Sequence, residues 1–419
     1  MASKKIEKCR LCGSDQLVKA IDLGEQYVMK ISNPSEDAQP AKEPLNLVLC
    51  TNCNLVQLTH SVDPDSMFHQ YHQRSGRSEK HREFLQEVVR EAIKRTTITF
   101  KDCAVDIGCN DAVLLEAYPP EVPKIGFDPA RNMGIKRTSF DTWTIEGREL
   151  RNAELVVQYF SLPRYKLERE EEKVKIVTTV DVLQDIEDPK QFIKDMAEIL
   201  HPRGTWVNQM PYLPGVLLNN EVNVFSHESL TYWNFQTFRK QCREAGLEVY
   251  DVELVGGSNS ILRAFAQNRK TGLNRMSPSV AALAKKEASL KRTLPKSLAR
   301  FESAIQANAA KLKDIITRNA SAGRKTFAFG ATAGISTLMQ TYSVSTQVEG
   351  VADLDEQTWG KAIVGLSLPV LSPEEVEKQS PDFYLLENKA ALEDASVLLK
   401  GFVGRGGKFI TVLPEPAIV

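Results

Sequence analysis

Three features that would point to a membrane or to nucleic acid are missing from this sequence. No run of about 20 apolar residues occurs, so no membrane-spanning helix is expected. Lys and Arg number 53 against 54 Asp and Glu, a formal net charge of −1, and this balance gives no basic field for nucleic acid or an anionic membrane. The N-terminus, MASKKIEKCRLCG, has no apolar signal segment. We therefore expect a cytoplasmic protein.

Cysteine is scarce and odd in number, with seven among 419 residues, which argues against a disulfide framework. Four of the seven form two C-x-x-C pairs, CRLC and CTNC, which are Cys9, Cys12, Cys50 and Cys53. Two such pairs can hold one metal ion tetrahedrally, and Gly13 and Asn54 suit the tight turn after each pair. The alternatives are unrelated cysteine pairs or a redox motif. We predict a structural Zn²⁺ site, because four thiolates leave no open position for catalysis.

The glycine fingerprint of a pyrophosphate-binding loop, G-x-G-x-x-G, is also absent. In its place CAVDIGCNDAVLLEAY predicts a buried strand, a tight turn and a helix, and KIGFDPA predicts a second strand that ends in an acid. A single glycine followed by Asn-Asp suits a ligand without phosphates, such as S-adenosylmethionine. The alternative is any α/β protein with a tight first turn. The predicted cofactor residues are Asp106, Gly108, Asn110, Asp111, Asp128, Pro129 and Asp181.

Alternating strands and helices continue through the middle of the chain and predict a doubly wound sheet with a late antiparallel strand. A polar, helix-rich segment with a predicted break at Pro295 follows. Beyond it, KTFAFGATAGIST and VEGVADLD predict a second strand–turn–helix–strand unit. Its turn has backbone N–H groups that could bind a phosphate, although a plain tight turn is the alternative. The predicted substrate-binding residues are Gly330, Ala331, Thr332, Ala333 and Asp353.

Several segments in this order resemble the three-module C-methyltransferases that act on nucleotide-linked deoxysugars. They are CRLCG, LCTNCNLVQL, YHQRSGRSEKH, DIGCND, GFDP, LHPRGTWVNQMPYL, GGSNSILRAF, FGATAGISTLMQ and RGGKFITVLPEP. The resemblance implies an α/β protein with a zinc-binding module (1–75), a Rossmann-like class I methyltransferase core (76–268), a helical connection (269–320) and a Rossmann-like domain that holds the substrate (321–419). It also implies S-adenosylmethionine as cofactor and a nucleotide-linked ketosugar as substrate, methylated at carbon through an enolate.

The resemblance fails at the residues that would remove a proton from the substrate carbon. The family's Tyr-x-Glu-His signature corresponds to Ser226, His227, Glu228 and Ser229, so only the glutamate matches, and a second family histidine is here Asp185. Enolate formation needs a base that titrates near neutrality, which serine cannot supply. We therefore name His227, Glu228, Ser229 and Tyr71 as the catalytic candidates. A locally hydrogen-bonded loop histidine is the alternative for His227.

The family's residues around the nucleotide are also replaced, by Thr358-Trp359-Gly360 and by PDFYLLENK. Two further hypotheses follow from these departures. One is a binding or scaffold protein that has lost the chemistry. The other is methylation at oxygen or nitrogen of a different acceptor, which needs less activation.

Overall fold

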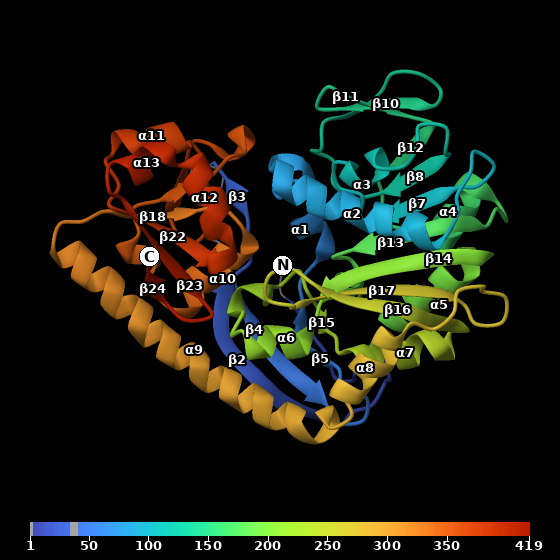
Figure 1. Ribbon diagram of the computed structural model, residues 1–419. Helices are drawn as coiled ribbons and strands as arrows, with labels where there is room; N and C mark the ends of the chain where they lie inside the picture. The colour runs from blue at the N-terminus through green and yellow to red at the C-terminus, as the bar shows by residue number, and fades with distance from the viewer. Residues whose placement is uncertain (1–2, 34–40) are drawn as a thin grey trace.

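The computed structural model describes residues 3–33 and 41–419 (Figure 1). The N-terminal part is built on an antiparallel sheet in the order β15-β5-β4-β2. Leu45, Leu47 and Leu49 of β4 are buried and alternate with more exposed residues, so this strand turns one face into the core. The elements are β1 (Lys4–Lys5), β2 (Leu17–Tyr27), β4 (Lys42–Cys50), β5 (Val56–Leu58), β6 (His60–Ser61) and α1 (Pro64–Phe68).

The central sheet has seven strands in the order β12-β8-β7-β13-β14-β17-β16. The first five are parallel and the β16–β17 hairpin is antiparallel, which confirms the predicted late antiparallel strand. All four residues of β7 are buried, as expected for a parallel strand covered on both faces. The strands are β7 (Ala104–Ile107), β8 (Lys124–Phe127), β12 (Ala153–Val156), β13 (Val174–Val180), β14 (Leu200–Pro211), β16 (Leu247–Val255) and β17 (Ile261–Asn268).

Helices pack around this sheet, and a small meander precedes its edge strand β12 (Figure 1). Strong N-caps start several of these helices; the Asp188 carboxylate, for example, accepts from the backbone of Gln191 at the start of α5. The helices are α2 (Glu79–Arg95), α3 (Val113–Glu116), α4 (Leu162–Arg169), α5 (Pro189–Ile199), α6 (Leu213–Leu218) and α7 (Phe235–Glu244), and the meander is β9 (Ile135–Arg137), β10 (Thr142–Ile145) and β11 (Arg148–Arg151).

The C-terminal sheet has eight strands in the order β24-β23-β22-β18-β19-β21-β20-β3. Its central strands are parallel, as the second strand–turn–helix–strand unit predicted. The strands are β18 (Thr326–Phe329), β19 (Val351–Ala352), β20 (Ala362–Ile363), β21 (Leu368–Leu371), β22 (Phe383–Asn388), β23 (Lys408–Leu413) and β24 (Ala417–Ile418), with helices α10 (Ala333–Thr341), α11 (Pro373–Lys378), α12 (Leu392–Leu398) and α13 (Lys400–Gly404).

Two helices, α8 (Pro278–Lys286) and α9 (Leu290–Ser321), join the central and C-terminal parts, and α9 runs the length of the C-terminal side (Figure 1). The predicted break at Pro295 is wrong, because Pro295 lies inside α9 and the chain breaks before Leu290. The buried side chains of α9 recur every three or four residues through Leu294, Leu298 and Phe301. This packing face continues past the proline and outweighs the backbone hydrogen bond that proline cannot make.

Two short strands pair with sheets that are formed mainly by other parts of the chain. β3 (Ile31–Ser32) pairs with β20 of the C-terminal sheet, and β15 (Thr231–Tyr232) pairs with β5 of the N-terminal sheet. One apolar cluster accordingly runs through Leu45, Phe301 and Val351 of three different modules. Among the described residues, no helix is long and apolar enough to cross a membrane.

Candidate functional site

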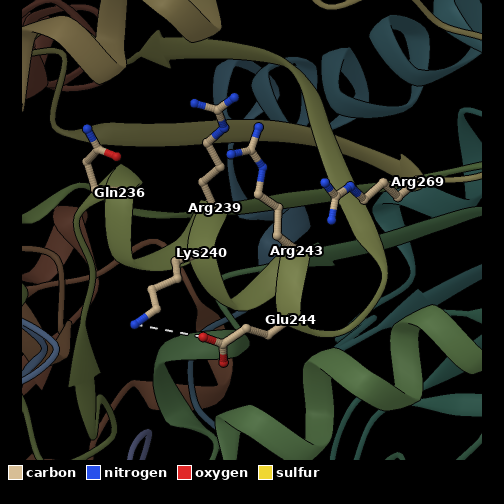
Figure 2. Close-up of a pocket in the computed structure, with 6 residues that line it drawn as sticks. All are labelled: Gln236, Arg239, Lys240, Arg243, Glu244 and Arg269. Atoms are coloured by element: carbon tan, nitrogen blue, oxygen red, sulfur yellow. Dashed lines mark ion pairs between the residues drawn. The ribbon is translucent and has the colours of Figure 1, made fainter.

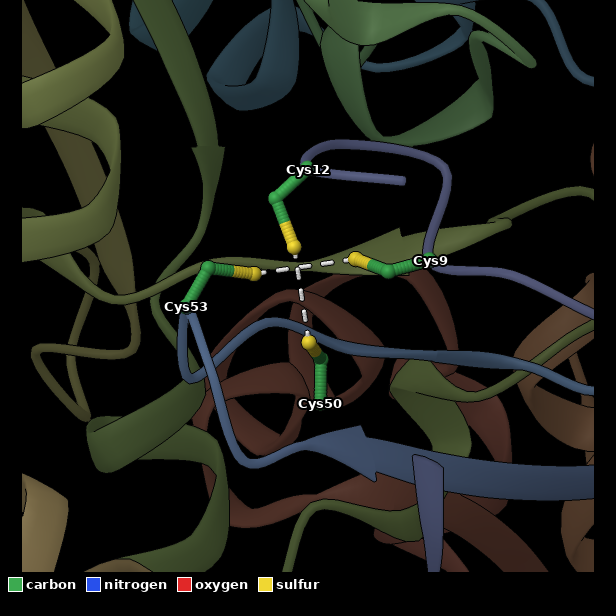
Figure 3. A group of neighbouring side chains, drawn as sticks. All are labelled: Cys9, Cys12, Cys50 and Cys53. Carbon is green, nitrogen blue, oxygen red and sulfur yellow. Dashed lines mark hydrogen bonds between the residues drawn. The ribbon is translucent and has the colours of Figure 1, made fainter. Parts of the chain in front are cut away.

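Four cysteines converge at one end of the N-terminal sheet (Figure 3). Their sulfur atoms all lie within 4.8 Å of one another, and the Cys9–Cys53 and Cys12–Cys50 pairs are each 3.6 Å apart. Zn–S bonds of about 2.3 Å in tetrahedral geometry put neighbouring sulfurs about 3.8 Å apart. The donor set and its spacing therefore fit one Zn²⁺ held by four thiolates, and this ion would be structural.

Backbone turns and neighbouring amides shape this cluster. The N–H of Gly13 bonds to the Cys9 carbonyl, and the N–H of Asn54 bonds to the Cys50 carbonyl, both at 2.9 Å. Gly13 and Asn54 have positive φ values of 71° and 63°, as their predicted place in tight turns requires. The Gln57 amide donates to the Cys9 sulfur at 3.1 Å. Such an outer contact orients the thiolate and compensates part of its charge.

The predicted cofactor turn lies at the carboxyl end of β7. Gly108 has a φ of 75°, and a Cβ there would come within 2.4 Å of the Val182 side chain. Its N–H and that of Cys109 both donate to the Phe127 carbonyl of the adjacent strand β8. The turn is therefore held against the sheet, and the Val182 side chain packs against Gly108 so closely that no larger residue fits there.

Three acids surround this turn, and two of them have an oxygen without a partner among the described residues. Asp106 accepts from the Thr178 hydroxyl at 2.6 Å, and Asp111 accepts from the N–H of Gly76 at 2.9 Å. The second oxygen of each of these two carboxylates is buried and unpaired. Buried acceptors without donors are costly, so they suit a ligand that carries N–H groups or positive charge. Burial also raises the pKa of Asp106 to about 7.

Asp128 and Asp181 end the strands on either side of this turn. Asp128 accepts from the N–H groups of Asn110 and Ala130, each at 2.8 Å, and is followed by Pro129. Asp181 is solvent-accessible but recessed among protein atoms, and this partial desolvation raises its pKa to about 6. The residues present fit S-adenosylmethionine: the carboxylates suit its amino group and ribose hydroxyls, and the turn lacks phosphate-binding glycines.

A second group of polar side chains comes together from three segments. The Tyr71 hydroxyl donates to Glu228 at 3.3 Å, and the Ser229 hydroxyl donates to Asp185 at 3.1 Å. Burial raises the pKa of Glu228 to about 7, and the Tyr71 hydrogen bond acts in the opposite direction. Burial, followed by the charge of Glu228, raises the pKa of Asp185 well above its usual value. The pKa of Tyr71 is likewise raised, first by burial and then by Glu228, so its hydroxyl remains a donor.

His227 does not join this group, contrary to its selection as a candidate base. Its Nε2 hydrogen-bonds to the backbone carbonyl of Glu43 at 3.1 Å, and the side chain is 5% exposed. Burial lowers the pKa of this imidazole. The side chain is thus engaged with the N-terminal sheet while Glu228 pairs with Tyr71. Ser226 also lies outside the group, since its N–H donates to the Tyr232 hydroxyl at 3.3 Å.

The predicted phosphate turn of the C-terminal domain already has carboxylates around it. The N–H of Ala331 donates to Asp353 at 2.5 Å, and the N-cap hydroxyl of Thr332 accepts from Ile335 at 3.0 Å and donates to Glu387. A Cβ on Gly334 would fall 2.7 Å from Glu387. The remaining predicted residues, Gly330 and Ala333, flank this arrangement. A carboxylate at the start of α10 repels phosphate, so the geometry does not favour the predicted site.

A larger surface pocket, which shares no residue with either group, lies along α7 (Figure 2). It is lined by Gln236, Arg239, Lys240, Arg243, Glu244 and Arg269. Arg243 pairs with Glu248 at 2.9 Å and Lys240 pairs with Glu244 at 3.8 Å. No acid–base residue of the candidate site lines it, and we regard it as a surface of paired charges.

Sequence reasoning missed Lys30 and Glu387. Lys30 lines the same small pocket as Tyr71, His72 and Glu228, and Glu387 accepts a hydrogen bond from Thr332 at the C-terminal turn. No local pattern signals either residue, because nothing in the sequence shows which distant modules meet.

Comparisons with known proteins cover almost the whole chain. Residues 9–68 match the model of a zinc binding domain, residues 77–252 match a methyltransferase domain and residues 253–414 match the C-methyltransferase C-terminal domain. The C-methyltransferase NovU of Streptomyces niveus is 24% identical over 424 aligned residues, which are 99% of this chain and 97% of the relative.

Two solved structures are similar to part of this chain. A chain from the Haloferax volcanii complex of the Trm112 activator with a methyltransferase is 14% identical, with a TM-score of 0.36, over 47% of this chain and 99% of its own. An S-adenosylmethionine-dependent methyltransferase of Clostridium acetobutylicum is 12% identical, with a TM-score of 0.33, over 44% and 91% of the two chains.

The three domain matches occur in the order that the sequence predicted, and the four-cysteine cluster and the central sheet agree with the first two of them. The chain therefore carries a zinc-binding N-terminal module, a methyltransferase core and a C-methyltransferase C-terminal domain, and it is an S-adenosylmethionine-dependent methyltransferase.

Proposed function

We propose that this methyltransferase acts at a carbon atom of a nucleotide-linked ketosugar or a related anionic metabolite, through an enolate. The proposal is supported by the C-methyltransferase C-terminal domain match and by the relative NovU, a C-methyltransferase. The observation that carries it is the Tyr71–Glu228 hydrogen bond in a desolvated setting, which provides a carboxylate whose pKa of about 7 suits proton abstraction.

Each polar residue has a separate role in the proposal. Glu228 takes the proton from the carbon next to the substrate carbonyl. Tyr71 remains protonated, and its single hydroxyl proton, which bonds the Glu228 carboxylate before the reaction, can donate to the oxygen that becomes negative once Glu228 has taken up a proton. The Ser229 hydroxyl donates a hydrogen bond to Asp185 and positions this second carboxyl group beside Glu228. S-adenosylmethionine, when bound, supplies the electrophilic methyl group.

The cofactor would be held by the turn at Gly108 and its three surrounding acids. Asp106 and Asp111 offer unpaired buried oxygens, and Asp128 lies at the end of β8 where ribose hydroxyls are bound in this fold class. Gly108→Ala would place a methyl group 2.4 Å from Val182 in a backbone conformation that alanine disfavours.

Two measurements test this proposal. Calorimetry with S-adenosylhomocysteine should show binding to the native chain and a loss of roughly tenfold or more in affinity for Gly108→Ala. Mass spectrometry of reactions with nucleotide-linked ketosugars should show methyl transfer that falls by roughly 10²- to 10⁴-fold in Glu228→Gln, while binding of S-adenosylhomocysteine is kept. Glu374→Gln, at an exposed position of α11, is the matched control.

Each outcome has a clear meaning. If the native chain does not bind S-adenosylhomocysteine, the proposed methyl transfer is contradicted and the alternative of a binding or scaffold protein is favoured. Full transfer activity in Glu228→Gln would remove the proposed base. Transfer to oxygen or nitrogen instead of carbon would replace the enolate route.

A further inference from the structure

A short segment between α1 and α2, residues 69–77, is hydrogen-bonded to the cofactor turn. The N–H of Ser75 donates to the Asn110 side chain at 3.1 Å, and the N–H of Gly76 donates to the Asp111 carboxylate at 2.9 Å. The Asn110 amide donates back to a carbonyl of the same segment at 2.9 Å. A Cβ on Gly76 would fall 2.7 Å from Asp111, so the backbone of segment 69–77 lies against an acid of the cofactor site.

The same segment carries Tyr71, and Asn132 fixes its backbone. The N–H of Tyr71 donates to the Asn132 side chain at 3.0 Å, and the Asn132 amide donates back to the Tyr71 carbonyl at 2.8 Å. Asn132 follows Asp128, the acid at the end of β8, by four residues. The position of segment 69–77 therefore affects both the cofactor turn and the proposed oxyanion donor.

Arg74 lies in the middle of this segment and links it to two other parts of the chain. Its guanidinium donates to the Asn132 carbonyl at 2.6 Å and to Glu146, in the turn between β10 and β11. It also donates to the Gln357 side-chain oxygen at 2.7 Å, and its Nε lies 3.6 Å from Asp355. Gln357 and Asp355 belong to the C-terminal domain, so one side chain joins that domain to the segment beside the cofactor turn.

Burial makes this link stronger than a surface ion pair. Arg74 is 6% exposed, and the Asp355 side chain is 11% exposed. Water screens such a pair poorly, and removal of one partner leaves the other charge without compensation. Lys80 of α2 also contacts the C-terminal domain, through Asp394 at 3.1 Å, but this pair is exposed and such pairs contribute little. Arg74 therefore makes the stronger of these two contacts.

We infer that Arg74 is a positioning residue for the methyl donor: its contacts with the C-terminal domain hold segment 69–77 against the cofactor turn. Arg74 acts through the neighbouring backbone N–H groups of Ser75 and Gly76, which bond the side chains of the turn. Docking of the C-terminal domain and closure of this segment on the cofactor site are thereby coupled. The inference requires S-adenosylmethionine as donor and holds whichever atom of the acceptor is methylated.

Arg74→Met and Asp355→Asn test the two ends of this link in the full-length chain. Calorimetry should show S-adenosylhomocysteine binding roughly tenfold more weakly to Arg74→Met and roughly threefold more weakly to Asp355→Asn, which keeps the Gln357 contact. The double variant should bind no more weakly than Arg74→Met, because both changes break one link. Arg74→Lys should restore only part of the affinity, because an ammonium group lacks the planar fork of donors.

Hydrogen exchange gives a second measurement that needs no ligand. In the unliganded chain, the backbone amides of residues 71–77 should exchange faster in Asp355→Asn than in the native protein, although Asp355 lies in another module. The amides of β13, a central strand of the core, should exchange as they do in the native chain.

Arg95→Met is the matched control. Arg95 pairs with Glu91, Asp251 and Glu253 inside the core and makes no contact with segment 69–77 among the described residues. Its loss also breaks several ion pairs, but S-adenosylhomocysteine should bind as it does to the native chain. Circular dichroism establishes that each variant is folded.

The outcomes separate this inference from the proposed function. Native affinity and native exchange in Asp355→Asn would overturn the inference, as would equal weakening by Arg74→Met and Arg95→Met. Methyl transfer to carbon with unchanged S-adenosylhomocysteine affinity in the Arg74 and Asp355 variants would keep the proposed function and overturn this link. Weakened binding in both variants, together with transfer to oxygen or nitrogen, would support the link and contradict the enolate route.

Discussion

Carboxyl groups with raised pKa values gather around the two candidate sites. Burial is the first cause for Asp106, Asp185 and Glu228 alike, and neighbouring acids add to it for Asp106 and Asp185. Such groups cost folding free energy when they are ionised, so their retention points to a use. We propose that Glu228 acts as a base and that the unpaired oxygen of Asp106 accepts a hydrogen bond from a ligand.

The hydrogen bond from Tyr71 should set the pH at which Glu228 becomes active. The base must be ionised, so methyl transfer by the native chain should rise with pH through about 7 and then level off. Tyr71→Phe removes a donor that stabilises the carboxylate and lowers its pKa, so the rise should move to higher pH. The dependence of kcat/KM on pH measures this shift.

Tyr384→Phe is the matched control, because the Tyr384 hydroxyl is buried in the C-terminal domain without a partner among the described residues. Its profile should overlay that of the native chain. A Tyr71→Phe profile that also overlays the native one would show that this hydrogen bond does not control the titrating group.

Two short strands connect parts of the chain that lie far apart in the sequence. β3 contains two residues and β15 contains two, yet each adds to a sheet built from a different part of the chain. Ile31 of β3 is 2% exposed and belongs to the same apolar cluster as Leu368 and Val370 of β21. β3 therefore contributes apolar burial as well as hydrogen bonds to the C-terminal sheet.

Shortening this side chain should weaken the attachment of β3. Ile31→Ala removes a buried side chain from the junction and should lower the free energy of unfolding by about 2–4 kcal/mol. Val18→Ala, at a strand position that is 47% exposed, should change it by less than about 0.5 kcal/mol. Denaturant unfolding followed by fluorescence compares the two. If both substitutions lower the free energy of unfolding by the same small amount, the Ile31 side chain does not contribute to the attachment of β3.

At the scale of the whole molecule, the cysteine cluster and the methyltransferase core share one interior. Cys9 and Cys50 belong to the same apolar cluster as Phe238 and Cys242 of α7. The Thr237 hydroxyl donates to the Cys53 carbonyl at 2.9 Å. A metal that fixes the cysteines therefore also supports one face of the core.

Loss of a thiolate should affect both modules together. Cys50→Ser should abolish binding of about one Zn²⁺ per chain, measured by elemental analysis, and should lower the melting temperature of the core as well as of the N-terminal sheet. Cys103→Ala, a buried cysteine outside the cluster, should keep the metal. A Cys50→Ser variant that loses zinc but melts like the native chain would show that the ion stabilises no more than its own loop.

The sequence predicted local chemistry well, because a turn or a metal ligand set is encoded by residues a few positions apart. The two C-x-x-C pairs, the glycine turn at 108 and the order of strands and helices were all legible in this way. The predicted module boundaries remain a proposal, since β3 and β15 cross them.

Tertiary structure alone decided which side chains face one another. In the folded chain His227 hydrogen-bonds to the Glu43 carbonyl, and Tyr71 donates to Glu228. Glu387 lies at the start of α10. These contacts join residues far apart in the chain, and their geometry depends on how whole sheets and helices pack. Local patterns determine what each segment can form, whereas packing between modules determines which proton acceptor and which charges lie together.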